Sequence, residues 1–154
     1  MSLSIYKAAE NKGVLLPVPP MAGGNYNPVQ LRGNIGYVAI QFPIQETIFT
    51  HQGKLGQEFT TEDGYQAMRL CALNVLAQIN EYVTMDRLEG INHITAYYRS
   101  AENWDEAPSI VNGASDLFKQ ILDTKGEHSR SLLGVHALPK NFSVGLTVTF
   151  TFQN

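Results

Sequence analysis

The stretch FSVGLTVTFTFQ, residues 142–153, has the clearest periodicity in the sequence and decides the fold class. Every even-numbered position from 142 to 152 carries an apolar side chain, and every odd-numbered position carries serine, glycine, threonine or glutamine. Neighbouring side chains of a β-strand point to opposite faces of the sheet. This period of two predicts a long strand with one apolar face and one polar, uncharged face.

Outside this strand, hydrophobic spacing predicts two long helices and further strands. Apolar residues recur at i, i+3, i+4 and i+7 in two segments, which is typical of amphipathic helices. Short runs rich in β-branched and aromatic residues predict strands. The expected helices span 62–82 and 107–124, the expected strands span 36–42, 91–98 and 131–137, and additional strands are expected near 14–16 and 47–49. This order, βαβαββ, predicts an α+β domain whose two long helices cover one face of a mixed sheet.

The opposite face of the predicted sheet has no further long amphipathic segment to cover it. Two interpretations are open: the face is solvated, or it packs against other copies of the same sheet. Antiparallel sheets commonly leave one face in water, where charged residues are frequent. Because the polar face of the last strand carries no charge, we favour self-association.

Composition limits the protein class. The 154 residues fit one domain over 1–154, with 1–12 expected as a less ordered extension and the Pro- and Gly-rich residues 17–28 as an irregular segment. The formal net charge of −3 makes nucleic acid an unexpected partner. The lone Cys71, the missing secretory signal and the absence of a long apolar run favour a soluble cytoplasmic protein without a membrane partner.

Few residues indicate chemistry by themselves. The sequence contains no HExxH or paired CxxC pattern and no glycine-rich nucleotide-binding motif, so neither a metal nor an organic cofactor is expected. Cys71 falls on the apolar side of a predicted helix and is expected to be inert core packing. Arg130 lies at the start of a predicted strand, where its guanidinium could hold a carboxylate bidentately. A surface arginine and a structural ion pair are the alternatives.

Four segments, in this order and spacing, resemble the Rid family, also called the YjgF family. They are GNIGYVAIQFP at 33–43, VNGASDLF at 111–118, SRSLLGV at 129–135 and ALP at 137–139. The resemblance spans residues 13–154, and YQAMRLCALN at 65–74 is similar to a longer branch of the family. It implies a chorismate-mutase-like α+β fold, assembled as a homotrimer with a central barrel and with clefts between subunits.

The resemblance also implies an activity. Members of the family hydrolyse 2-imino acids and their enamine tautomers to 2-oxo acids and ammonia, without a metal or an organic cofactor. The implied partner is therefore a small carboxylate ligand. The label "L-PSP endoribonuclease" is attached to part of the family, and we rank RNA cleavage last because the chain is acidic overall.

Three candidate site residues match the family pattern. Arg130 matches the arginine that holds the substrate carboxylate, and Asn112 matches an asparagine of the second helix. Tyr26 matches the tyrosine of the cleft and is the candidate catalytic residue, because it could polarise water or the substrate nitrogen.

Four further positions of the expected substrate-binding cleft depart from that pattern. Ala39 and Ile40 stand in place of a serine and a glycine, and Leu132 stands in place of a cysteine. Gly145 stands in place of the glutamate that would position or activate water. A positioned acid–base group typically contributes about 10²–10⁴-fold to such a step. We expect Gly145 to leave room on its strand for a larger side chain, with Ile40 and Leu132 as the residues that could obstruct it.

Two principal hypotheses follow. The chain is a divergent imine deaminase in which Arg130 holds the substrate and Tyr26 assists hydrolysis, or it is a trimer that binds a small carboxylic acid without efficient catalysis. The loss of the glutamate at Gly145 is the sequence feature that separates them.

Overall fold

The alternating stretch forms β7, Val144–Phe152, the central strand of a five-stranded sheet in the computed structural model, which describes residues 2–154. Strands β2 (Ile35–Gln41) and β5 (Leu88–Tyr98) flank it in antiparallel fashion. Strand β1 (Val29–Arg32) lies at one edge beside β2, and β6 (Ser129–Gly134) lies parallel to β5 at the other edge. The sheet order β1-β2-β7-β5-β6 is therefore mixed, as predicted.

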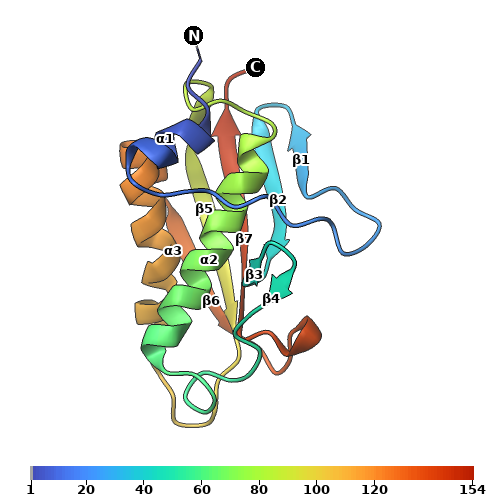
Figure 1. The fold of residues 1–154 in the computed structure, drawn as a ribbon, viewed down its shortest axis with the longest axis vertical. Helices are drawn as coiled ribbons and strands as arrows, with labels where there is room; N and C mark the ends of the chain where they lie inside the picture. The colour runs from blue at the N-terminus through green and yellow to red at the C-terminus, as the bar shows by residue number, and fades with distance from the viewer. Residues whose placement is uncertain (1) are drawn as a thin grey trace.

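Three helices cover one face of this sheet (Figure 1). The two long ones are α2 (Thr61–Asn80) and α3 (Ala107–Leu122), as the hydrophobic spacing predicts. They approach closely at Gly113, where a Cβ atom would overlap the backbone oxygen of Tyr65. The apolar side of β7 faces these helices, and its Phe150 is fully buried.

A capping box fixes the start of α2. The Thr60 hydroxyl accepts a hydrogen bond from the Asp63 amide at 3.1 Å, and the Asp63 carboxylate accepts one from the Thr60 amide at 2.9 Å. These bonds satisfy amide groups that have no partner within the helix. The negative charge also lies favourably at the positive end of the helix dipole.

Other segments differ from expectation. The prediction of a less ordered extension is wrong for Ile5–Asn11, which forms α1 and buries Ile5 completely. Residues 14–16 form no strand, although Val14 and Leu16 are buried. Strand β1 was not expected from the sequence. The strand expected near 47–49 is present as β4 (Ile48–Phe49), which pairs with β3 (Ile44–Gln45) in a short hairpin.

The polar face of β7 carries no helix within the described chain (Figure 1). Thr147, Thr149 and Thr151 are only half-buried on this face, and the neighbouring Tyr37 of β2 is 48% exposed. One face of the sheet is thus packed and the other open in a single chain. Within residues 2–154, no helix has both the length and the apolar character that crossing a membrane requires.

Candidate functional site

Arg130 lies on the edge strand β6 and points toward α3. It is in register with the fully buried Ile94, so its side chain is on the helical side of the sheet. Its Nη1 donates to Asn112 Oδ1 at 2.8 Å and to Ser115 Oγ at 3.2 Å, and its Nη2 donates to the Pro108 carbonyl at 3.3 Å. Within residues 2–154, no carboxylate forms an ion pair with this guanidinium. Its charge is therefore held by neutral acceptors.

His128 supports this arrangement from behind Ser115. Its Nδ1 lies 2.6 Å from the Gly126 carbonyl, which can only accept, so we assign the proton to Nδ1. Its Nε2, at 2.8 Å, then accepts from the Ser115 hydroxyl, which in turn accepts from Arg130. Burial lowers the pKa of His128 below the usual 6.5, which keeps the ring neutral near pH 7.

The structure brings two further candidates near this guanidinium. Asn112 is in direct contact with it, as described above. Leu132 lies on the same side of β6, in register with the buried Ala96, and packs against the hydrophobic core. The first group of predicted residues is therefore Arg130, Asn112 and Leu132. The supporting Ser115 and His128 were not predicted, because their roles depend on how α3 and the turn before β6 pack together.

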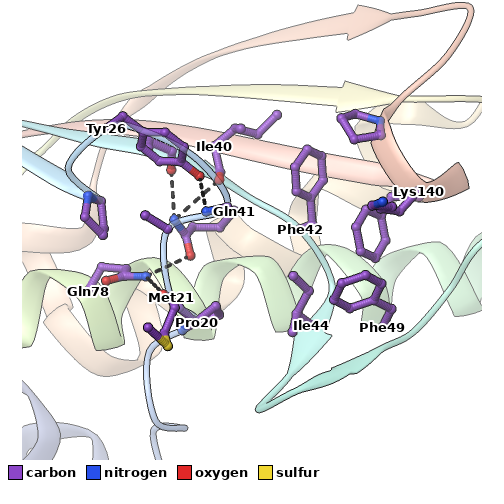
Figure 2. Close-up of a pocket in the computed structure, with 16 residues that line it drawn as sticks. Pro20, Met21, Tyr26, Ile40, Gln41, Phe42, Ile44, Phe49, Gln78 and Lys140 are labelled. Carbon is purple, nitrogen blue, oxygen red and sulfur yellow. Dashed lines mark hydrogen bonds between the residues drawn. The ribbon is translucent and has the colours of Figure 1, made fainter.

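A second group of predicted residues lines a cavity near the far end of β2. The cavity has a volume of about 580 Å³ and is formed by the loop before β1, the end of β2, the β3–β4 hairpin and the turn before β7. Its lining residues include Pro20, Met21, Tyr26, Ala39, Ile40, Gln41, Phe42, Ile44, Phe49, Gln78, Lys140 and Phe142. We call it the aromatic cavity. Figure 2 shows Tyr26 and Lys140 at its opposite ends, with Ile40 and Phe42 between them.

A bulge in β2 shapes this cavity. The pairing of β2 with β7 shifts register between Val38 and Gln41, which places Ala39 and Ile40 outside the regular ladder. The Gln41 amide group donates to the Ala39 carbonyl at 3.0 Å, and its oxygen accepts from Gln78 Nε2 at 3.3 Å. Bulges often re-aim side chains next to binding sites. Here the buried amide fixes the backbone that carries two of the predicted residues.

Tyr26 is oriented by its own loop. Its hydroxyl accepts a hydrogen bond from the Gly23 amide at 3.0 Å, and the side chain is 49% exposed. The hydroxyl hydrogen remains available to a ligand, because this bond uses only an oxygen lone pair. Tyr26 can therefore donate a hydrogen bond at the mouth of the cavity.

The structure limits the room that was expected at Gly145, and the obstruction comes from Ile40, one of the two residues expected to cause it. A Cβ atom at this position would lie 2.7 Å from Ile40 Cδ1 and 3.1 Å from Phe42 Cε1. Gly145 is in register with Tyr97 on the open face, whereas Leu132 lies on the helical face and does not obstruct it. The space beside Gly145, where the resemblance implies a carboxylate, is therefore narrowed by Ile40 of β2 and by Phe42, which follows that strand.

Sequence reasoning missed the aromatic wall of the cavity. Phe42 and Phe142 stack with ring centroids 4.9 Å apart and planes within 9°, and Phe49 lies against Phe142 at 5.2 Å. Phe142 belongs to the alternating stretch, but its position in the turn before β7 directs it here. The left-handed φ of 54° at Lys140 and 61° at Asn141 shapes that turn.

The two groups of candidate residues lie near opposite edges of the sheet. Arg130 is on β6, while Ala39 is on β2 and Tyr26 precedes β1. A single chain therefore does not assemble one site from all of them. Within the described residues, no cluster of three histidine, cysteine, aspartate or glutamate side chains is arranged to hold a metal ion.

Comparison with known proteins places this geometry in a family. Protein TCP17 of Trypanosoma cruzi is 28% identical over 144 residues, covering 92% of this chain and 90% of that protein. A Shewanella oneidensis structure that carries an endoribonuclease label is 28% identical with a TM-score of 0.92, over 97% of this chain and 99% of that one. E. coli TdcF, solved with bound serine, shares the fold at 19% identity with a TM-score of 0.60, over 87% and 93% of the two chains.

The family model gives the assignment directly. The model of the YjgF/chorismate mutase-like family, whose description also carries an endoribonuclease label, matches residues 8–152. The match includes every candidate residue described above, from Tyr26 to Gly145. The chain therefore belongs to the YjgF/chorismate mutase-like family.

Proposed function

We propose that this chain binds small 2-oxo or 2-imino carboxylic acids through Arg130, in clefts between the subunits of a homotrimer, and hydrolyses imines weakly or not at all. The observation that carries the proposal is that the Arg130 guanidinium has no carboxylate partner among residues 2–154. Its hydrogen bonds go to neutral groups only. Charge-assisted bonds to a ligand carboxylate would complete this set.

The free donors of Arg130 favour a carboxylate. Its Nη1 and Nη2 groups donate three hydrogen bonds in total, which leaves the Nε hydrogen and one Nη2 hydrogen without an acceptor among residues 2–154. An Nε hydrogen and an Nη2 hydrogen of a guanidinium can together donate to the two oxygens of a carboxylate.

A cleft between subunits would explain why the candidate residues form two separate groups within one chain. Arg130 stands on an edge strand, while Tyr26 and Ala39 stand near the other edge. The open, uncharged face of the sheet supports packing of several copies around a central barrel. In such an assembly the Arg130 edge of one subunit could meet the aromatic cavity of the next.

The bound serine of TdcF supports the ligand class. Serine is a small molecule with a carboxylate next to a carbon that bears nitrogen, and TdcF shares the fold of this chain. A 2-imino acid has the same arrangement, and a 2-oxo acid replaces nitrogen by oxygen. For this chain we propose this class of small carboxylic acids as ligands, and not serine itself.

Weak hydrolysis is proposed because the water-handling carboxylate is missing. Imine hydrolysis adds water to the carbon, transfers a proton to nitrogen and releases ammonia with the 2-oxo acid. Gly145 offers no acid, and Ile40 and Phe42 fill the space above it. Tyr26 and Lys140 are then the residues lining the aromatic cavity that could donate a proton near the substrate nitrogen, and we propose Tyr26 for this role.

Calorimetric titration with 2-oxobutyrate tests the binding function. Arg130→Lys should weaken binding by about tenfold, since a lost bond to a charged group is worth about 1.5 kcal/mol. Arg69→Lys on α2 is the matched control and should leave affinity unchanged. Unchanged affinity in Arg130→Lys would refute the role of Arg130.

Two further measurements test the remaining parts of the proposal. Light scattering at micromolar protein concentration should give the mass of three chains, and a stable monomer would exclude a cleft between subunits. Ammonia release from freshly generated imino acids should be slow. Rapid release that depends on Arg130 would establish the deaminase instead.

A further inference from the structure

We propose that the aromatic cavity receives a bulky apolar or aromatic side chain of the carboxylic acid, so that the preferred ligand is an aryl-bearing or large aliphatic 2-oxo or 2-imino acid. This inference rests on the proposed function and specifies its ligand. The cavity volume is about 580 Å³, within the range of about 300–1,000 Å³ found for pockets that hold drug-sized ligands. A three- or four-carbon acid would fill only a small part of it.

The wall of the cavity is suited to an aromatic ring. Phe42 and Phe142 form a stacked pair, and Phe49 is inclined by 57° to Phe142 (Figure 2). Ring pairs prefer offset-stacked or edge-to-face arrangements, and this wall offers both faces and edges. Ile40 and Ile44 add aliphatic surface between the rings and the neighbouring strands.

The two buried amide side chains of the cavity already have partners. Gln41 Nε2 donates to the Ala39 carbonyl, and Gln78 Nε2 donates to the Pro20 carbonyl at 2.8 Å and to Gln41 Oε1. The donors that remain for a ligand, Tyr26 and Lys140, lie at the two ends of the cavity, and the wall between them is apolar (Figure 2). A hydroxyl group placed against that wall would lose its water without gaining comparable bonds, so this part of the cavity discriminates against polar side chains.

The charge at the cavity also agrees with an acidic ligand. Lys140 is the one charged residue among those that line the cavity in the described chain. With no acid in the lining, the local potential attracts anions rather than amines. The ligand thus combines a negative group with an apolar body.

The mouth of the cavity exposes apolar side chains. Met21 is 94% exposed and Phe49 is 44% exposed in the isolated chain. Exposed apolar surface of this kind marks a ligand or protein contact. Because the aromatic walls are concave, they favour a small ligand over a flat protein surface. The competing occupant is a neighbouring subunit, and the test must distinguish it from a ligand.

A matched pair of acids tests the inference. 2-Oxobutyrate and 2-oxo-4-phenylbutyrate differ only by the phenyl group, and both are titrated calorimetrically against the native protein. We expect the phenyl compound to bind at least about tenfold more tightly, as burying one ring commonly produces. Phe49→Ser should remove most of this difference, so that the two acids bind with similar affinity. Ile48→Ser is the matched control, because Ile48 is 66% exposed on the same strand and does not line the cavity.

The outcomes separate this inference from the proposed function. If neither acid binds, the proposed function fails and the inference falls with it. If 2-oxobutyrate binds and depends on Arg130 but the phenyl group adds nothing, only the inference is overturned. A phenyl preference that survives in Phe49→Ser also overturns it. If the native protein shows no phenyl preference and Phe49→Ser dissociates the oligomer, measured by light scattering, then a neighbouring subunit rather than a ligand fills the cavity, which likewise overturns the inference.

Discussion

Replacing Gly145 by glutamate should destabilise the protein rather than restore hydrolysis. Glutamate is the residue that the family pattern carries here, so the substitution looks like a repair. The structure argues against this, because even the Cβ atom would lie 2.7 Å from Ile40 Cδ1 and 3.1 Å from both Ile40 Cγ1 and Phe42 Cε1. Such contacts are closer than packed carbon atoms tolerate, so Ile40 would have to move.

The size of the effect follows from the cost of overpacking, which is typically about 1–3 kcal/mol. The nearest atom is the end of the half-buried Ile40 side chain, which can turn away, so we expect a loss of about 1–2 kcal/mol. Such a loss is a measurable part of the stability of about 5–15 kcal/mol usual for a domain.

Urea unfolding measures this cost. With an m-value of about 2 kcal/mol/M, a loss of about 2 kcal/mol lowers the midpoint by about 1 M. Protein concentration must be equal in all samples, because association changes apparent stability. Ile40→Gly and the double variant Ile40→Gly/Gly145→Glu are the controls, and the double variant should be more stable than Gly145→Glu alone. An unchanged midpoint in Gly145→Glu would refute the packing argument, and imine hydrolysis by that single variant would refute the claim that the space is filled.

Three other predictions concern parts of the fold away from this contact. Thr60→Ala removes the capping box of α2 and should cost about 0.5–2 kcal/mol in urea unfolding, while Thr124→Ala, at an exposed position away from this cap, serves as the comparison. Cys71 should resist iodoacetamide in the native protein and react after denaturation, because the thiol is fully buried and burial raises its pKa; rapid native-state labelling would contradict this. Stability should decline as the pH falls below about 6.5, since burial lowers the folded-state pKa of His128 and His51 and the unfolded chain then binds more protons. His128→Gln should make that decline shallower, and an identical pH profile would show that His128 does not titrate with unfolding.

The main elements could be predicted because their signals are local. The alternation of residues 142–152 identifies β7, and the spacing of apolar residues identifies α2 and α3 within a few residues. Strand β1, residues 29–32, has only four residues, too few for the alternation of VQLR to identify a strand, so its existence depends on pairing with β2. Helix α1 has only seven residues, and burial of Ile5 against the core stabilises it more than helix propensity does.

The candidate site could be predicted only in part for a related reason. Arg130 and Asn112 were both predicted to belong to the substrate-binding cleft, and the structure places them in contact at 2.8 Å. The space at Gly145 could not be judged, because it depends on the bulge in β2 that turns Ile40 over it. Residue identity shows that a carboxylate is missing, whereas only the three-dimensional register shows what replaced it.

The sheet order itself constrains how the site could work. Strands β2 and β6 are separated by β7 and β5, so three strand spacings of about 4.8 Å, or about 14 Å, lie between Ala39 and Arg130. The two residues also differ in orientation, since Arg130 points to the helical side. A small carboxylic acid cannot touch both within one chain. Either Arg130 binds the ligand without the aromatic cavity, or a second chain supplies that cavity. Loss of the phenyl preference on dilution to monomers, with 2-oxobutyrate still bound, would support the second arrangement, because separate subunits keep Arg130 but lose the cavity next to it.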